Sequence, residues 1–255
     1  MSFNNIFNDL ISEKKVLTRS EVQQEYQSLI DHLSTKNNVL LITSSNRWAG
    51  AEQKAKSTQL AYNIKDSLPD NNIKVIEADK LNIRCCTGNV SLASGNICGA
   101  KDALLKSSEK NPTGQIRCWE AKHRDDEMYK VANEIFKADA VVFFTSVRWG
   151  QTNSIYQKLI ERLTWLENRW SCLGESNLLE NKEAGIVVIG FNWKDKQVMQ
   201  TQRSVLEMFG FKTPAKLSMY WQFTDDATDE SKQSYKAAVS QFQDDFDVRL
   251  QKKTK

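Results

Sequence analysis

The sequence has 255 residues, of which 40% are hydrophobic and 26% charged, as is ordinary for a globular chain with a sizeable core. Its net charge of +3, from 35 basic and 32 acidic residues, is too small to indicate nucleic-acid or membrane binding. There is no apolar run long enough to span a bilayer and no secretory signal, and the odd number of cysteines, five, favours a reducing cytoplasm.

The first 37 residues are predicted to form a helical arm ahead of a sheet. Apolar side chains recur at helical spacing in residues 6–11 and again in residues 22–33. Thr18 and Glu21 have the spacing of a capping box at the start of the second helix. We expect this arm to pack on its own domain or on a second subunit, in a structural role.

Residues 39–61 hold the most informative stretch. An apolar run at 39–42 is typical of a buried strand, and a hydroxyl-rich loop ending in Arg47 separates it from a helical pattern. The first turn of a helix offers free N–H groups and a favourable dipole to an anion. Because the glycine-rich dinucleotide and triphosphate motifs are absent, the pattern favours a monophosphate held by side-chain hydroxyls. Plain helix capping by Ser and Thr is the alternative.

Strands and helices alternate through the rest of the chain. Further strands are predicted at residues 73–76, 140–144, 185–189 and 217–221, with helices near 128–136, 155–166, 198–209 and 235–246. Asp125 and Asp126 are typical of a helix start. The alternation predicts a doubly wound parallel α/β sheet, in which ligands bind beyond the carboxyl ends of the strands. The loops after the first, third and fourth strands meet at that edge.

Residues 78–122 form an unusually long connection without clear periodicity, which is typical of a lid or a binding loop. This connection contains Cys85, Cys86, Cys98 and Cys118. Their spacing lacks the C-x-x-C pairs that zinc and iron–sulfur sites use, so no metal is expected, and free or redox-active thiols are the alternative. His32 is expected to be structural and His123 to lie at the surface.

Several motifs together carry a family resemblance. S-S-N-R at 44–47 and K-S-T-Q-L-A at 56–61 are similar to G-S-x-R and S-N-T-x-x-L-A, the two ends of a phosphate loop. D-D at 125–126, A-D-A-V-V-F at 138–143, S-V-R-W-G at 146–150, L-I-E-R-L at 159–163 and K-E-A at 182–184 follow in the matching order. In this order they resemble the flavodoxin-like NAD(P)H-dependent FMN reductases, a family that includes iron–sulfur flavoproteins. The resemblance covers about residues 38–216.

The resemblance implies a flavodoxin-like three-layer sandwich. Its parallel sheet would have five strands in the order 2-1-3-4-5, within a domain at residues 38–222, flanked by a helical arm at 1–37 and a helix with a basic tail at 223–255. The chain departs from the family at Ser44, where glycine is usual, at Ser146, where proline is usual, and at Arg148, where an aromatic residue is usual. Its phosphate loop is also longer.

The resemblance further implies bound FMN, with NAD(P)H as co-substrate and flavin N5 carrying the chemistry in place of catalytic side chains. The implied cofactor-binding residues are Ser45, Asn46, Arg47, Ser57, Thr58, Gln59, Ser146, Val147, Arg148, Trp149, Gly150, Gly190, Phe191 and Asn192. For Arg47 the alternative is a solvated loop cation, for Trp149 a core aromatic, and for residues 190–192 a plain turn.

The expected activity is electron transfer from NAD(P)H through FMN to a quinone, a flavin or another small acceptor. The expected protein is a cytoplasmic homodimer with no nucleic-acid or membrane partner. One alternative is a flavodoxin-type electron carrier without its own NAD(P)H turnover, and another is a flavin-free interaction protein that keeps only the fold. Carriers of the flavodoxin type are usually shorter and acidic, which disfavours that interpretation.

Overall fold

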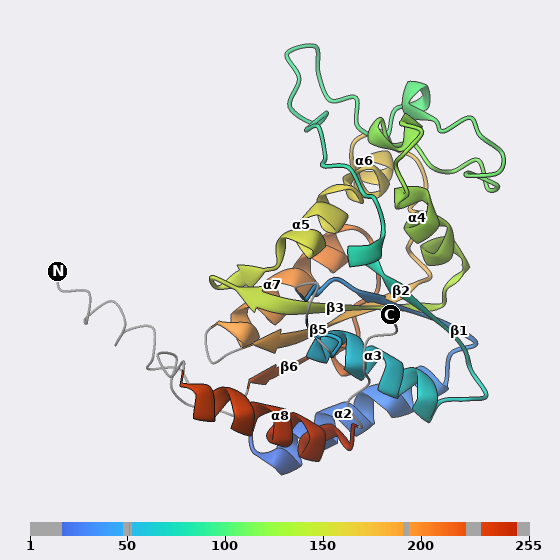
Figure 1. The fold of residues 1–255 in the computed structure, drawn as a ribbon. Helices are drawn as coiled ribbons and strands as arrows, with labels where there is room; N and C mark the ends of the chain where they lie inside the picture. Colours follow the sequence, from blue (N-terminus) through green and yellow to red (C-terminus); the bar gives the residue numbers. More distant parts are fainter. Residues whose placement is uncertain (1–16, 48–50, 52, 191–193, 223–230, 249–255) are drawn as a thin grey trace.

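The computed structural model describes residues 17–47, 51, 53–190, 194–222 and 231–248. A single sheet lies between two layers of helices (Figure 1). Helices α2 (Arg19–Ser34), α3 (Lys56–Ser67) and α8 (Lys232–Phe246) cover one face. Helices α4 (Met128–Lys137), α5 (Ser154–Glu161), α6 (Thr164–Ser171) and α7 (Asp195–Met208) cover the other. This arrangement is the three-layer sandwich that the resemblance implied.

The parallel sheet has the predicted strand order. Its strands are β1 (Asn38–Thr43), β2 (Asn72–Glu77), β3 (Ala140–Arg148), β5 (Glu183–Gly190) and β6 (Met219–Gln222), in the spatial order β2-β1-β3-β5-β6. A two-residue strand, β4 (Gln151–Thr152), pairs antiparallel with the end of β3 and was not predicted. The order confirms the predicted 2-1-3-4-5 topology and brings the carboxyl ends of β1, β3 and β5 side by side.

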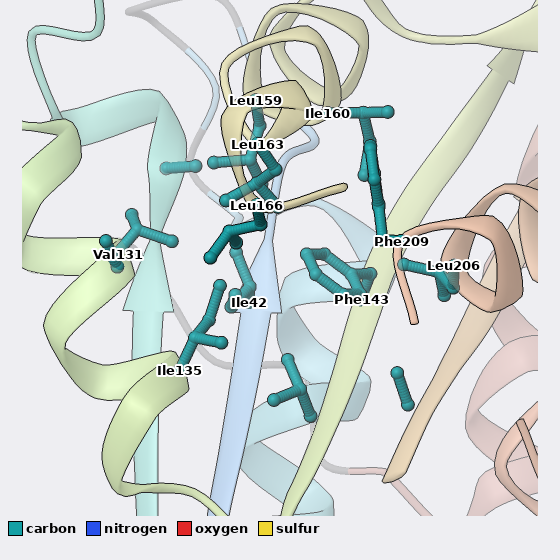
Figure 2. Close-up of a cluster of buried hydrophobic side chains, with 14 of the residues drawn as sticks. Ile42, Val131, Ile135, Phe143, Leu159, Ile160, Leu163, Leu166, Leu206 and Phe209 are labelled. Carbon is teal, nitrogen blue, oxygen red and sulfur yellow. The ribbon is translucent and has the colours of Figure 1, made fainter. Parts of the chain in front are cut away.

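The apolar side chains of the central strands alternate between the two faces. Figure 2 shows Ile42 and Phe143 packed against Val131 and Ile135 of α4 and against Leu159 of α5. Side chains of β1, β3 and β5 on the other face pack with α2, α3 and α8. Strands buried on both faces explain why these segments are continuous apolar runs in the sequence.

The described part of the N-terminal arm packs on its own sheet. Thr18 caps α2, since its hydroxyl accepts from Glu21 N–H at 3.3 Å and Glu21 Oε2 accepts from Thr18 N–H at 2.8 Å, which confirms the predicted capping box. Leu29 and Leu33 are fully buried in the core of this face. The predicted helix at residues 6–11 lies outside the described residues.

Helix α8 joins the same face through an aromatic cluster. The indole N–H of Trp221, at the end of the sheet, donates to Asp245 Oδ2 at 2.8 Å. Phe242 lies edge-on to Trp221 at 5.3 Å, and Phe246 lies edge-on to Tyr26 of α2 at 5.1 Å. These contacts fix the second half of α8, whereas most residues of its first half are exposed.

Some predicted boundaries were wrong. The predicted fifth strand at 217–221 starts later, because Leu217 closes a 3-10 turn, Ala215–Leu217, before β6. The predicted helix at 155–166 is two helices, since a tight turn in which Leu163 N–H donates to Ile160 O separates α5 from α6. Asp126 precedes α4 as expected and accepts from Met128 N–H at 3.1 Å.

A buried ion pair holds the long connection at residues 78–122 to the domain. Arg162, at the end of α5, donates to both carboxylate oxygens of Asp126 at 2.6 and 3.0 Å, and both side chains are fully buried. The same guanidinium donates to Arg84 O at 2.8 Å and to Cys118 Sγ at 3.3 Å. The connection is therefore anchored at both of its ends, although it has little regular structure beyond three 3-10 turns.

All five cysteines are free thiols. Burial, followed by the nearby Cys118 and Cys86, raises the pKa of the Cys98 thiol to about 12, so this thiol stays protonated and unreactive at neutral pH. Over the part of the chain that the structure describes, no three His, Cys, Asp or Glu side chains are placed to hold a metal ion. Within the same residues, no helix is both long and apolar enough to cross a membrane.

Candidate functional site

An open cavity of about 220 Å³ lies at the carboxyl edge of the sheet. The loop after β1, the carboxyl ends of β3 and β5 and the start of α3 meet there, with one side chain from α8. The lining residues are Ser45, Asn46, Arg47, Ala55, Lys56, Ser57, Ser146, Val147, Arg148, Ile189, Gly190 and Tyr235. The ends of the three strands that the sequence placed at one edge therefore border one site, and the loop at residues 191–193 lies outside the described residues.

Most of the predicted cofactor-binding residues lie on this cavity. Those that line it are Ser45, Asn46, Arg47, Ser57, Ser146, Val147, Arg148 and Gly190. Thr58 is buried in the first turn of α3, and Trp149 and Gly150 form the turn beside Arg148. The N–H of Gln59 donates to Ala55 O and is not available to a phosphate, and its side chain lines a neighbouring cavity. Phe191 and Asn192 lie outside the described residues.

Two buried hydroxyls on the cavity have no hydrogen-bond partner. Ser45 is 5% exposed and Ser57 is 1% exposed, and neither Oγ atom meets a donor or acceptor among the described residues. Leaving a buried polar group unpaired costs about 1–3 kcal/mol, so native structures keep few of them. Both hydroxyls are therefore available as donors to an oxygen-rich ligand.

The first turn of α3 is also uncapped. Its N-cap residue is Ala55, and no side chain there accepts a hydrogen bond from the helix. Ser44, at the end of β1, instead donates its hydroxyl to Phe144 O at 2.9 Å. The alternative that these hydroxyls serve as ordinary helix caps is therefore wrong, and the amino end of α3 is left open to an anion.

Three basic side chains converge on the cavity. Desolvation and then the charge of Arg148 lower the pKa of Arg47. Desolvation and then the charge of Arg47 lower the pKa of Lys56 to about 8. Among the described residues that line the cavity there is no Asp or Glu. Because Arg148 lowers the pKa of Arg47 and Arg47 lowers that of Lys56, the three positive charges are close enough to repel one another. A bound anion would offset the free-energy cost of this repulsion.

Trp149 stands at the tip of the β3–β4 hairpin. Arg148 pairs with Gln151 across the turn, and both Trp149 and Gly150 have positive φ, +51° and +70°. This is the backbone of a two-residue type I′ turn, which is strained for a bulky side chain. The indole is 90% exposed. The alternative of a core aromatic is therefore wrong.

Asn153 is a buried residue of this region that sequence reasoning missed. Its amide nitrogen lies 2.9 Å from Thr145 Oγ1 and 3.3 Å from the Oγ atoms of both Ser44 and Ser146. Its Oδ1 accepts from Tyr156 N–H at 3.0 Å and so caps α5. One amide thus ties the loop after β1 to the carboxyl end of β3. Asn at a helix start is the only sequence signal for it.

Gly190 allows a close approach at the end of β5. A Cβ added there would lie 3.0 Å from Val147 Cγ2 and 3.3 Å from Asp195 Cβ. A side chain there would require Val147 and Asp195 to shift by a few tenths of an ångström. Tyr235 was also missed, because α8 lies beyond the residues that the family resemblance covers and its apolar pattern signals only packing.

No family model and no curated protein matches the sequence. Among solved structures, 155 chains match in three dimensions. The structure of RosB with bound 8-demethyl-8-formylriboflavin-5'-phosphate has a TM-score of 0.50 and 14% identity over 82% of this chain and 78% of RosB. An azoreductase from Bacillus anthracis str. Sterne has a TM-score of 0.48 and 13% identity over 83% of this chain and 97% of its own.

An NADPH-quinone reductase from P. pentosaceus has a TM-score of 0.42 and 10% identity, covering 81% of this chain and 96% of its own. All three structures are less than 25% identical to this chain. At such low identity they show the fold alone. The strand order and the likeness to RosB show that the chain has a flavodoxin-like α/β fold.

Proposed function

We propose that this protein is an NAD(P)H-dependent oxidoreductase with FMN bound at the carboxyl edge of its sheet. One observation carries the proposal, namely the two buried, unpaired hydroxyls of Ser45 and Ser57 beside the cations Arg47 and Lys56. Hydroxyl donors, basic side chains and an uncapped helix start are the groups that bind a phosphate monoester. RosB, with its riboflavin 5'-phosphate derivative, gives this fold a precedent for such a ligand.

Each wall of the cavity has its own role in this proposal. Ser45, Asn46, Arg47, Lys56, Ser57 and Thr58 hold the phosphate, with Gln59 behind them. Ser146, Val147, Arg148, Trp149 and Gly150 run along the isoalloxazine ring, and Gly190, Phe191 and Asn192 border the ring and the ribityl chain.

When bound, the flavin accepts hydride from NAD(P)H and passes electrons to a quinone, a flavin or another small acceptor. The residues of this chain bind and orient it. Arg47 and Lys56 neutralise the phosphate, and Asn153 holds the loop after β1 and the end of β3 in a fixed relation. The exposed indole of Trp149 offers an aromatic face to a ring or to a second subunit. The proposed protein is a cytoplasmic homodimer without nucleic-acid or membrane partners.

The test is the visible absorption spectrum of the purified protein reconstituted with FMN, recorded before and after NADPH is added. We expect flavin bands that bleach on addition and recover when a quinone is supplied. Bound flavin that NADPH does not reduce would identify a flavodoxin-type carrier. A protein that takes up no FMN would refute the flavin site itself.

A further inference from the structure

The orientation of the buried Asn153 amide is fixed by the start of α5. The backbone N–H of Tyr156, which can only donate, lies 3.0 Å from one terminal atom of this amide. That atom must therefore be the oxygen, Oδ1, and the other terminal atom must be the nitrogen, Nδ2. Turning the amide over would set two N–H groups against each other inside the protein and leave both without an acceptor.

The Nδ2 atom of Asn153 in turn sets the direction of three hydrogen bonds. Its hydrogens are shared by Thr145 Oγ1 at 2.9 Å and by the Oγ atoms of Ser44 and Ser146 at 3.3 Å. Because an amide nitrogen donates and does not accept, all three hydroxyl oxygens are acceptors toward it. Each hydroxyl must therefore send its own hydrogen elsewhere, and Ser44 sends its hydrogen to Phe144 O at 2.9 Å.

Ser146 is the hydroxyl of this group that lines the cavity at the carboxyl edge of the sheet. Thr145 and Ser44 are buried, whereas Ser146 is half-buried. Over the described part of the chain, Ser146 Oγ has no hydrogen bond besides the one from Asn153. The hydrogen of Ser146 is therefore available to a ligand in the cavity.

We propose that Ser146 donates its hydroxyl hydrogen to an acceptor atom of the ligand, and that Asn153 is the positioning residue that aims this donor. The hydrogen bonds run in one direction, from Tyr156 N–H to Asn153, from Asn153 to Ser146 and from Ser146 into the cavity. This end of the cavity therefore selects a ring carbonyl oxygen or an unprotonated ring nitrogen and disfavours an N–H group.

The inference rests on the proposed function in one respect, because a flavin ring is taken to supply the acceptor atom. The donor itself is a feature of this chain. Ser146 stands where the family that the sequence resembles usually has proline, which has no side-chain donor.

The first experiment is calorimetric titration of the wild type, Ser146→Ala and Ser146→Thr with FMN and with riboflavin. A neutral hydrogen bond changes a binding constant by roughly 2- to 12-fold. We expect Ser146→Ala to weaken both ligands by this factor, because the lost donor faces the ring and not the phosphate. Ser146→Thr restores the hydroxyl and should restore the affinity.

Thr145→Val is the matched control for the Ser146 variants. It removes a hydroxyl that contacts the same amide of Asn153 but does not line the cavity. Its affinity for FMN should stay within about twofold of the wild type, below the effect of a lost ligand hydrogen bond.

The second experiment reverses the hydrogen bonds with Asn153→Asp. The carboxylate keeps an oxygen for Tyr156 N–H and so keeps the cap of α5, but it can only accept. The hydroxyl of Ser146 should then turn toward the carboxylate and away from the cavity. Riboflavin is the probe, because the added carboxylate would also repel the phosphate of FMN. We expect Asn153→Asp to bind riboflavin as weakly as Ser146→Ala does.

The double variant separates positioning from a structural role. If Asn153 acts through Ser146, Asn153→Asp should have no further effect on riboflavin binding once Ser146 is alanine. If Asn153 only holds the loop after β1 against the end of β3, the two effects should add in full, and this result would overturn its role as a positioning residue.

Two further results would overturn the inference. Equal FMN affinities for the wild type and Ser146→Ala would remove the donor and leave the flavin site standing. A wild type that takes up no FMN would refute the proposed function and, with it, this role of Ser146, so the two failures are distinguishable. The Ser146 variants decide even if Asn153→Asp does not fold.

Discussion

Ser57 has a buried hydroxyl with no partner, at the first turn of α3. Ser57→Ala removes an unsatisfied polar group, so we expect the thermal stability of the flavin-free protein to be unchanged or higher. A hydrogen bond to a charged phosphate contributes about 1.5–3 kcal/mol, so FMN affinity should fall roughly 10- to 150-fold. Calorimetry and a melting curve measure both effects.

Ser67→Ala is the matched control, because Ser67 lies at the far end of the same helix and its hydroxyl donates to Asn63 O. It should leave FMN affinity unchanged. Equal FMN affinity in wild type and Ser57→Ala would remove Ser57 from the phosphate site.

The lowered pKa of Lys56 leads us to expect that cofactor binding depends on pH. Since desolvation and Arg47 lower its pKa to about 8, the ammonium is present at pH 7 and is lost as the pH rises through 8. FMN affinity should therefore be flat between about pH 6.5 and 7.5, where the phosphate stays largely dianionic, and should fall above pH 8. Fluorescence titrations at a series of pH values measure the curve, and Lys56→Arg should flatten it because arginine stays protonated.

The contribution of Lys56 to the stability of the flavin-free protein should change with pH in the opposite direction. The folded pKa of Lys56 lies below that of a free lysine, near 10.5, so the unfolded chain binds more protons between about pH 8 and 10.5. The penalty that this lysine places on folding therefore relaxes as the pH rises through that window. A urea midpoint that falls more steeply in the wild type than in Lys56→Met over this range would contradict the assignment.

At the scale of elements, the β3–β4 hairpin has a strained backbone at Trp149 and an exposed indole side chain at the same residue. Trp149→Gly relieves a positive φ of +51°, which offsets the flexibility that glycine adds to the unfolded chain. We expect stability to be unchanged or about 1 kcal/mol higher, while flavin affinity drops. Trp149→Phe keeps the aromatic face and should keep the affinity. If Trp149→Gly binds flavin as well as the wild type does, the indole has no role in the cofactor site.

A second prediction at the scale of elements concerns the contacts that join the long connection to α5. Asp126→Ala leaves the guanidinium of Arg162 buried and uncompensated, so it should lower the free energy of unfolding by about 3–5 kcal/mol. Asp125→Ala is the control, because Asp125 has 57% of its side chain exposed and pairs with Arg84 at 3.4 Å. Its cost should stay below about 1 kcal/mol. Chemical denaturation of the two variants compares them directly, and equal midpoints would mean that the buried pair is not a main anchor.

Element by element, local patterns in the sequence were enough to predict the parallel sheet, the capping box at Thr18 and the edge at which the ends of β1, β3 and β5 meet, whereas the strand order came from the family resemblance. They missed β4, because two residues are too short for a pattern, and they joined α5 to α6, because the apolar spacing continues across the break. Asn153 and Tyr235 were missed for a different reason. Their roles depend on contacts with residues far away in the chain, which no local pattern reports.

At the scale of the whole molecule, a ligand that binds only the folded state stabilises all of it. FMN at one hundred times its dissociation constant should add about 2.7 kcal/mol, a rise in melting temperature of roughly 5–10 °C for a domain of this size. Riboflavin, which lacks the phosphate, should give a much smaller shift at the same concentration. Equal shifts for the two ligands would mean that the basic cavity does not hold the phosphate.

Helix α8 has a consequence for how the protein is made. Tyr235 forms part of the cavity wall, and the helix is fixed to the sheet through Phe242, Asp245 and Phe246 in its second half. A nascent chain that has not yet extended past β6 lacks this wall. On the proposed function, flavin should therefore bind only after α8 has been made.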